Sequence, residues 1–264
     1  MPLTFPAHQS FVIGLKMKWP RGVDATALCI GAAMPDLAYP LGDWLNRQSH
    51  AFIGVVVWAI PVTLVAAALV RWRAGAGIFA HVPDLGPLRL RSYQVLSLRR
   101  PPLLVTLVSA VVGAGSHVVI DAFTHRSRWG AQWLGLDRVV GTVPIRGEFT
   151  WARVLQYLGH TVGSVAFVLV IVWIASRGRL GQWYGPEAVD RVRRLRVTPG
   201  RRLLFWAVVL APVVAAVASG PQTNSGRVFL PILGLFVGFL AAGVVMAGPS
   251  LRAARPETAP VAAG

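Results

Sequence analysis

Residues 102–121 read PLLVTLVSAVVGAGSHVVID, and this stretch decides how the rest of the chain is interpreted. Its 20 residues contain no Lys, Arg, Asp or Glu before the final aspartate. That is about the length that an α-helix needs to cross the hydrocarbon core of a bilayer. Near its end lie His117 and Asp121, and side chains four residues apart share one face of a helix. The stretch therefore predicts a membrane-spanning helix that carries a polar pair at one end.

The rest of the chain has the composition of a membrane protein. Its 264 residues are 55% hydrophobic and 14% charged, with a mean hydropathy of +0.58, whereas soluble domains carry about 25% charged residues. Four further apolar segments approach the length of a span: residues 51–70, 154–175, 203–219 and 228–247. We therefore predict an all-α, polytopic membrane bundle with five clear spans. It forms a single domain over residues 1–248, followed by a disordered tail over residues 249–264.

Lys and Arg are distributed unevenly over the connections between these spans. Four connections hold 19 of the 26 basic residues: 16–22, 71–101, 176–202 and 248–264. Basic loops stay in the cytoplasm, so we place the long loops 71–101 and 176–202 on the inner side of a cytoplasmic (inner) membrane. The net charge of +16 would indicate nucleic acid in a soluble protein. Here the loops account for it, and we predict the lipid bilayer as a partner and no nucleic acid.

The chain before the first clear span predicts a hairpin of two short helices, over residues 7–19 and 23–34. Each would be roughly 18–20 Å long. A Pro-Arg-Gly break turns the chain between them, so that Asp36 returns to the level of His8. The alternative is a sixth span over residues 24–39 with the N-terminus inside, which would place His8 on the opposite side of the membrane.

Polar side chains gather at one face when the chain is threaded in this way. Charged or metal-binding groups next to hydrocarbon are costly and usually functional. Seven of them lie near the ends of apolar segments: His8, Asp36, His50, His117, Asp121, His125 and His160. Imidazoles and carboxylates are ligands of zinc, manganese and iron, so we predict a divalent-metal site, with zinc first. Its predicted ligands are Asp36, His50, His117 and Asp121, joined by His8. A polar cluster that merely joins helices is the alternative.

His125 and His160 are predicted to work beside the metal, as a general acid that protonates a leaving group. Binding a second ion or orienting other ligands are alternative roles for both. The site predicts a metal-dependent hydrolase at the outer membrane–water interface, with a lipid headgroup or an envelope phosphoester as its substrate. The alternative is a non-enzymatic membrane protein, either an ion or metal transporter or a structural partner. The sequence predicts no oligomeric state.

Several motifs together resemble a known family. They are Met-Pro-Leu-Thr-Phe at residues 1–5 with His8, Met-Pro-Asp-Leu-Ala-Tyr at 34–39, Ser-His at 49–50, and the segment from Ser-His to Asp-Ala-Phe-Thr-His at 116–125. This combination resembles the bacterial domain-of-unknown-function family 4184. That family consists of multi-pass membrane proteins without an established activity, and the resemblance covers most of the chain.

The pattern is also similar to predicted inner-membrane metal-dependent hydrolases, which share a Pro-Asp, Ser-His and His-x-x-x-Asp arrangement. More remotely, it resembles the zinc-dependent phospholipase C and single-strand nuclease superfamily. That resemblance implies cleavage of a phosphoester, with all seven polar residues as ligand candidates. The chain departs from this superfamily at Ser164, which stands four residues after His160 where the superfamily has Glu. The metal-binding N-terminal residue of that superfamily also has no obvious counterpart, so the resemblance implies one or two ions rather than three.

Overall fold

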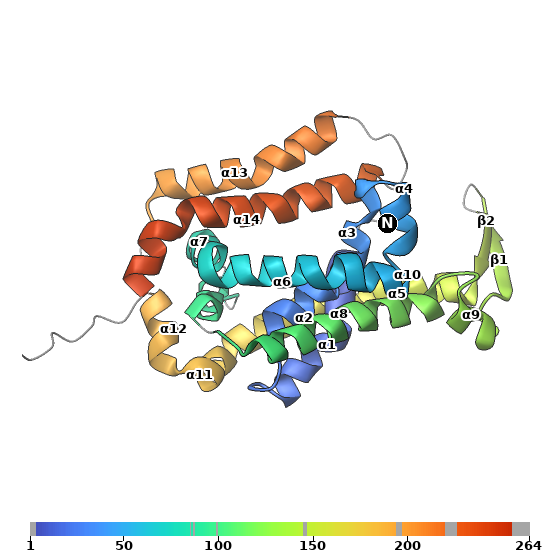
Figure 1. The fold of residues 1–264 in the computed structure, drawn as a ribbon, viewed down its shortest axis with the longest axis horizontal. Helices are drawn as coiled ribbons and strands as arrows, with labels where there is room; N and C mark the ends of the chain where they lie inside the picture. Colours follow the sequence, from blue (N-terminus) through green and yellow to red (C-terminus); the bar gives the residue numbers. More distant parts are fainter. Residues whose placement is uncertain are drawn as a thin grey trace, which may run out of the picture. The chain divides into compact units, whose positions relative to one another are not determined.

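The computed structural model describes residues 4–84, 86, 88–98, 100–144, 147–193, 197–219 and 226–254. Within these residues it is helical apart from one two-stranded antiparallel hairpin (Figure 1). Five helices are long and apolar enough to cross a membrane: Phe52–His81, α8 (Leu103–Thr124), α10 (Trp151–Ser176), α13 (Pro199–Ala218) and Phe229–Gly248 within α14 (Gly226–Ala254). They confirm the predicted all-α bundle with five spans. The predicted tail falls partly on α14, and its remainder, residues 255–264, lies outside the described residues.

Contacts within the chain divide it into two compact units, which are described separately. The first unit consists of Met1–Ala67, Pro101–Trp173 and Val213–Gly234. The second consists of Ala68–Arg100, Ile174–Pro212 and Leu235–Gly264. All seven polar residues singled out in the sequence belong to the first unit, so a site that they form lies within this unit.

The N-terminal hairpin is formed by α1 (Thr4–Lys18) and α2 (Ala25–Gly31), as predicted. Lys16 closes the turn because its Nζ donates hydrogen bonds to two carbonyl oxygens of the connecting segment. Asp24 caps α2 and accepts hydrogen bonds of 3.1 and 3.3 Å from backbone N–H groups of the first turn. These bonds satisfy donors that the start of a helix leaves without a partner.

The second helix of the hairpin is shorter than the predicted segment 23–34. It ends at Gly31, and Pro35 lies in the first turn of a separate short helix, α3 (Met34–Leu37). Proline is accepted in the first turn of a helix but breaks a helix interior, because it has no backbone N–H to donate. The chain then continues through η1 (Tyr39–Leu41) and α4 (Asp43–Gln48).

Small residues let α2 lie directly against α8, and Figure 1 shows the two helices side by side. A Cβ atom on Gly31 would come within 2.7 Å of the carbonyl oxygen of Ala110. A Cβ atom on Gly113 would collide with the carbonyl oxygen of Leu28. The close approach of the two backbones therefore determines that the face of α8 carrying Gly113 and, one turn later, His117 packs towards α2.

Gly113→Ala should therefore destabilise the first unit. The added methyl group meets backbone rather than a flexible side chain, and overpacking of this kind typically costs about 1–3 kcal/mol. Gly115→Ala is the matched control, because a Cβ atom there meets nothing within 4 Å. Thermal unfolding in detergent should show a lower midpoint for Gly113→Ala and no decrease for Gly115→Ala. Equal midpoints would contradict the close packing of α2 on α8.

The first span is longer than predicted. We expect a loop from residue 71, but the helix continues to His81. Arg73 is compatible with this extension, because it is exposed and a long basic side chain can lie along a helix and keep its charged end in a polar environment. Arg71, by contrast, is buried. The span is built from α5 (Phe52–Gly54), η2 (Val55–Ala59), α6 (Ile60–Leu69), η3 (Val70–Ala74) and α7 (Gly75–His81), with η2 and η3 as π-helical turns.

The connection between α8 and α10 is folded, which the sequence pattern does not predict. It contains α9 (Trp129–Trp133) and two antiparallel strands, β1 (Val139–Val143) and β2 (Gly147–Thr150). The first strand is exposed along its whole length. It therefore lacks the alternation of buried and exposed residues by which a half-buried strand is recognised.

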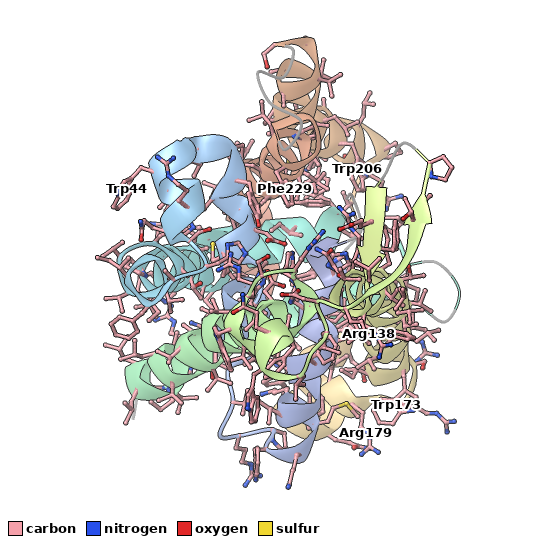
Figure 2. The ribbon with its side chains drawn as sticks, turned by 90° about the vertical axis from the view of Figure 1, so that its right-hand side faces the viewer. Trp44, Arg138, Trp173, Arg179, Trp206 and Phe229 are labelled. Atoms are coloured by element: carbon pink, nitrogen blue, oxygen red, sulfur yellow. The ribbon has the colours of Figure 1, made fainter. Side chains whose placement is uncertain are left out.

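Exposed tryptophans surround this end of the first unit. Trp44 on α4 is 58% exposed, Trp129 and Trp133 on α9 are 60% and 77% exposed, and Trp151 at the start of α10 is 48% exposed. Figure 2 shows Trp44 pointing away from its helix. Tryptophan is enriched where a membrane meets water. We therefore expect the end of α8 and the start of α10 to lie at a membrane–water interface.

The second unit has an aromatic core. Phe205 and Val209 of α13 pack with Ala242 and Met246 of α14, and all four are buried. The sixth histidine, His81, is buried in this unit and stacks on Phe205 with ring centroids 5.3 Å apart. The remaining elements of this unit are η4 (Leu90–Leu98), α11 (Arg179–Tyr184) and α12 (Pro186–Arg193).

Candidate metal centre

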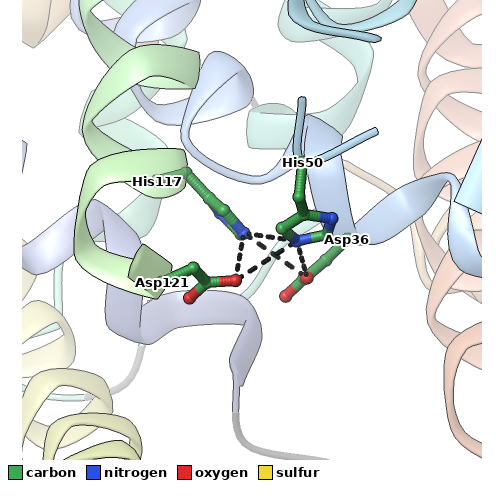
Figure 3. Close-up of side chains that lie close together, drawn as sticks. All are labelled: Asp36, His50, His117 and Asp121. Carbon is green, nitrogen blue, oxygen red and sulfur yellow. Dashed lines mark hydrogen bonds and ion pairs between the residues drawn. The ribbon is translucent and has the colours of Figure 1, made fainter. Parts of the chain in front are cut away.

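Four polar side chains of the first unit converge at one point, as Figure 3 shows. His117 and Asp121 lie one turn apart on α8 and point to the same side. Asp36 comes from α3, and His50 comes from the turn between α4 and α5. All four are buried. The structure thus brings together the four residues that the sequence predicts as the main ligands.

Neighbouring groups orient both imidazoles of this cluster. Nδ1 of His117 lies 2.7 Å from the carbonyl oxygen of Ala32. Because a carbonyl oxygen only accepts, this nitrogen carries a proton, and Nε2 is the ring nitrogen that faces the cluster. Nδ1 of His50 lies 2.8 Å from the hydroxyl oxygen of Ser49, so its Nε2 also faces the cluster. Partners of this kind fix the tautomer and the ring orientation of metal-binding histidines.

The donor atoms are spaced as the ligands of one ion would be. Nε2 of His50 lies 3.3 Å from Oδ1 of Asp36 and 3.2 Å from Oδ2 of Asp121. Nε2 of His117 lies 3.4 and 3.5 Å from the same two oxygens, and the two Nε2 atoms are 3.3 Å apart. Tetrahedral ligands about 2.1 Å from an ion are about 3.4 Å from one another. These five of the six separations fit this value, and the ligand atoms of all four residues lie within 4.8 Å of one another.

Hydrogen bonding alone fits the spacing less well. A hydrogen bond between an imidazolium and a carboxylate is about 2.7–2.9 Å long. Each of the four nitrogen–oxygen separations is at least 3.2 Å. The two Nε2 atoms also face each other at 3.3 Å, where an ion between them can accept both lone pairs. The cluster could therefore hold a metal ion.

The charges of the cluster favour a cation at its centre. Burial opposes ionisation of Asp36, but the neighbouring His117 and His50 outweigh it and hold the pKa of the Asp36 carboxyl below its usual value. Burial also opposes protonation of His50, but the neighbouring carboxylates of Asp121 and Asp36 outweigh it and raise the pKa of His50. The Asp36 carboxylate therefore stays ionised and draws positive charge into the site, as a proton or as a metal ion.

Asp121 reaches further histidines with its other oxygen. Its Oδ1 lies 3.6 Å from Nε2 of His8 and 3.5 Å from Nδ1 of His125. The ring of His8 stacks on that of His117, with centroids 3.8 Å apart. Burial and the nearby His117 lower the pKa of His8 to about 3, so His8 is a neutral imidazole. His8 and His125 thus lie beside the four-residue cluster and contact it through Asp121.

His160 lies further from the cluster. Its ring centroid is 6.1 Å from that of His8, and its Nδ1 is buried with no hydrogen-bond partner among the described residues. Gln156, one turn earlier on α10, places its side-chain amide 2.6 Å from Nε2 of His125. Sequence reasoning missed Gln156, although its spacing of four residues from His160 puts both on one face of the helix.

Five candidate spans and a buried cluster of two histidines and two aspartates define a multi-pass membrane protein with a candidate metal centre. The chain belongs to the family described as Domain of unknown function (DUF4184), whose family model matches residues 1–248. This match confirms the family resemblance that the motifs indicate. No curated protein and no solved structure matches the chain.

Proposed function

We propose that this protein is a metal-dependent hydrolase of the cytoplasmic membrane, with zinc as its ion and manganese or iron as alternatives. The observation that carries the proposal is the spacing of the four donor atoms, with five separations of 3.2–3.5 Å. Nitrogen and carboxylate oxygen together suit these metals. When bound, such an ion lowers the pKa of its coordinated water towards ~7 and so supplies hydroxide near neutral pH.

The proposed substrate is a lipid headgroup or an envelope phosphoester at the outer face of the membrane. The distribution of basic residues supports this side, because 19 of the 26 lie in segments 16–22, 71–101, 176–202 and 248–264, which we place on the cytoplasmic side even where a span extends into them. The exposed tryptophans near the cluster support its position at the interface. A headgroup phosphoester lies at that depth, so it can reach the site from within the bilayer.

The residues around the ion have separate roles in this proposal. The ligands are Asp36, His50, His117 and Asp121, and His8 adjoins them. Hydrolysis forms a bond between the water oxygen and phosphorus and breaks the bond from phosphorus to the leaving oxygen, which takes up a proton. We assign that proton to His160. Its rival, His125, has both ring nitrogens within 3.5 Å of other side chains, which leaves it less able to meet a substrate.

Hydrolysis in reconstituted vesicles tests the proposal. Wild-type protein loaded with zinc or manganese should release a water-soluble product from phosphatidylglycerol vesicles or cleave p-nitrophenyl phosphoesters. Asp121→Asn should do neither, because it keeps the size of the side chain but removes the charge that helps to hold the ion. Metal uptake into the vesicles without hydrolysis would contradict the proposal and favour the transporter alternative. Neither uptake nor hydrolysis, in folded protein that binds no metal, would favour a polar cluster that joins helices.

A further inference from the structure

A groove runs along the first unit next to the candidate metal centre. It lies between α1, α8 and α10 and has a volume of about 670 Å³, within the range of about 300–1,000 Å³ that is typical of small-molecule sites. Exposed apolar side chains border it: Phe11, Val119, Leu155, Leu158 and Val162. Because α8 and α10 are candidate spans, these side chains face hydrocarbon in a bilayer, and the groove is open to lipid.

The groove has a polar end and an apolar end. Thr124, at the end of α8, and Gln156, near the start of α10, line it on the side of the exposed tryptophans, and His8 and His160 lie next to them. Towards the other end, which includes Gly163 and Ala166, the lining is mainly apolar, and Ser10 is the polar residue there. A ligand that fits this arrangement has a polar group at one end and a hydrocarbon chain at the other.

Two buried nitrogens at the polar end have no partner within the described part of the chain. They are Nδ1 of His8 and Nδ1 of His160, and both side chains are more than nine-tenths buried. A buried polar atom without a hydrogen bond is costly and needs an explanation. By contrast, the hydroxyls of Ser10 and Thr124 donate to carbonyl oxygens of their own helices. The two histidines are therefore the groups that a polar ligand would satisfy.

The length of the groove matches one leaflet of a membrane. Its lining on α10 extends from Leu155 to Ala166, which corresponds to about 16 Å at a rise of about 1.5 Å per residue. Half of the hydrocarbon core of a bilayer is about 15 Å. A chain that enters at the interface and runs along this groove therefore ends near the middle of the bilayer, as the acyl chain of a phospholipid does.

We propose that this groove binds one acyl chain of a membrane phospholipid and presents the phosphate of its headgroup to the candidate metal centre. The statement about the phosphate rests on the proposed function, and the statement about the acyl chain does not. Lipid tails surround a membrane protein on all sides, so the groove has to select one acyl chain. It does so by the shape of the groove and by the polar groups at one end of the groove. Binding of the acyl chain in the groove would also hold a bilayer-anchored substrate in a fixed position relative to the residues of the site.

Gly159 offers a direct test, because it lines the groove and a Cβ atom there meets nothing within 4 Å. Gly159→Leu should therefore fill the groove without disturbing the backbone. Gly115→Leu is the matched control, since a Cβ atom on Gly115 also meets nothing within 4 Å and this residue does not line the groove. Thermal unfolding should show that both variants are folded.

Photo-crosslinking measures occupancy of the groove. The probe is phosphatidylglycerol with a diazirine at the end of one acyl chain, as a minor component of phosphatidylcholine vesicles that contain the protein. Label near Ala166 is compared by mass spectrometry with label at Val168 and Leu169, which are exposed apolar residues of the same helix outside the groove lining. We expect the ratio of label near Ala166 to label at Val168 and Leu169 to fall about tenfold in Gly159→Leu, equivalent to about 1.4 kcal/mol. In Gly115→Leu this ratio should be unchanged.

The outcomes separate the groove from the proposed function. An equal labelling ratio in wild type and Gly159→Leu would overturn the proposal that the groove binds an acyl chain, even if the protein bound metal and hydrolysed phosphoesters. A tenfold fall in protein that binds no metal would support the groove and contradict the proposed hydrolase. Asp121→Asn should keep the labelling ratio of wild type while it loses hydrolysis. If the ratio of label near Ala166 to label at Val168 and Leu169 fell in this variant, labelling would depend on the cluster and not on the shape of the groove.

Discussion

His117→Ala should purify without the metal ion that we expect the wild-type protein to carry. The substitution removes one of four donors and leaves two carboxylates facing a single imidazole. Removal of an outer partner of a metal ligand typically lowers metal affinity by about 10–100-fold, so loss of a ligand itself should lower it further. Mass spectrometry of the metal content of detergent-purified protein should find about one zinc, manganese or iron per chain in wild type and a background level in the variant.

His81→Ala is the matched control for this experiment. It also removes a buried imidazole, but from the second unit, so its metal content should equal that of wild type. Asp121→Asn guards against the possibility that His117→Ala does not fold, because it preserves the shape of the side chain. Folded wild-type protein that contains no metal, even after loading with zinc and manganese, would contradict a metal centre.

The core of the site could be predicted because its geometry is encoded in short spacings and in topology. His117 and Asp121 share a face of α8 for the simple reason that they are four residues apart on a helix. Asp36 and His50 join them because the N-terminal hairpin brings the chain back to the start of the first span, and α8 returns it from the other end of that span to the same side. The apolar segments define that side, so four residues distant in sequence could be placed together from the sequence alone.

Features that depend on where an element stops could not be predicted in the same way. The four-residue spacing would continue the polar face to His125, but α8 ends at Thr124 and His125 caps it. His125 therefore approaches Oδ1 of Asp121 and not the four donor atoms. Helix ends are set by local hydrogen bonds, which periodicity does not reveal. The groove is harder still to predict from the sequence, because it is formed where residues such as Gly159 provide no side chain.

His160→Gln should slow hydrolysis of a phospholipid while leaving the metal content unchanged. The variant keeps a polar side chain of similar length but cannot donate a proton as an acid. General acid catalysis typically contributes about 10²–10⁴-fold, and we expect a decrease in kcat of this size. His8 lies between the ring of His160 and the four donor atoms, and the ring centroids of His8 and His160 are 6.1 Å apart. Metal binding should therefore survive the substitution.

The choice of substrate distinguishes proton donation from a structural role of His160. The leaving oxygen of a lipid is an alkoxide that needs a proton, whereas p-nitrophenolate is stable as an anion and leaves without one. If His160 is the acid, His160→Gln slows the lipid reaction and spares the p-nitrophenyl ester. A structural defect would slow both substrates to the same extent. A lipid-specific defect in His125→Gln but not in His160→Gln would transfer the role to His125, whose contacts with Gln156 and Asp121 would then have to open during the reaction.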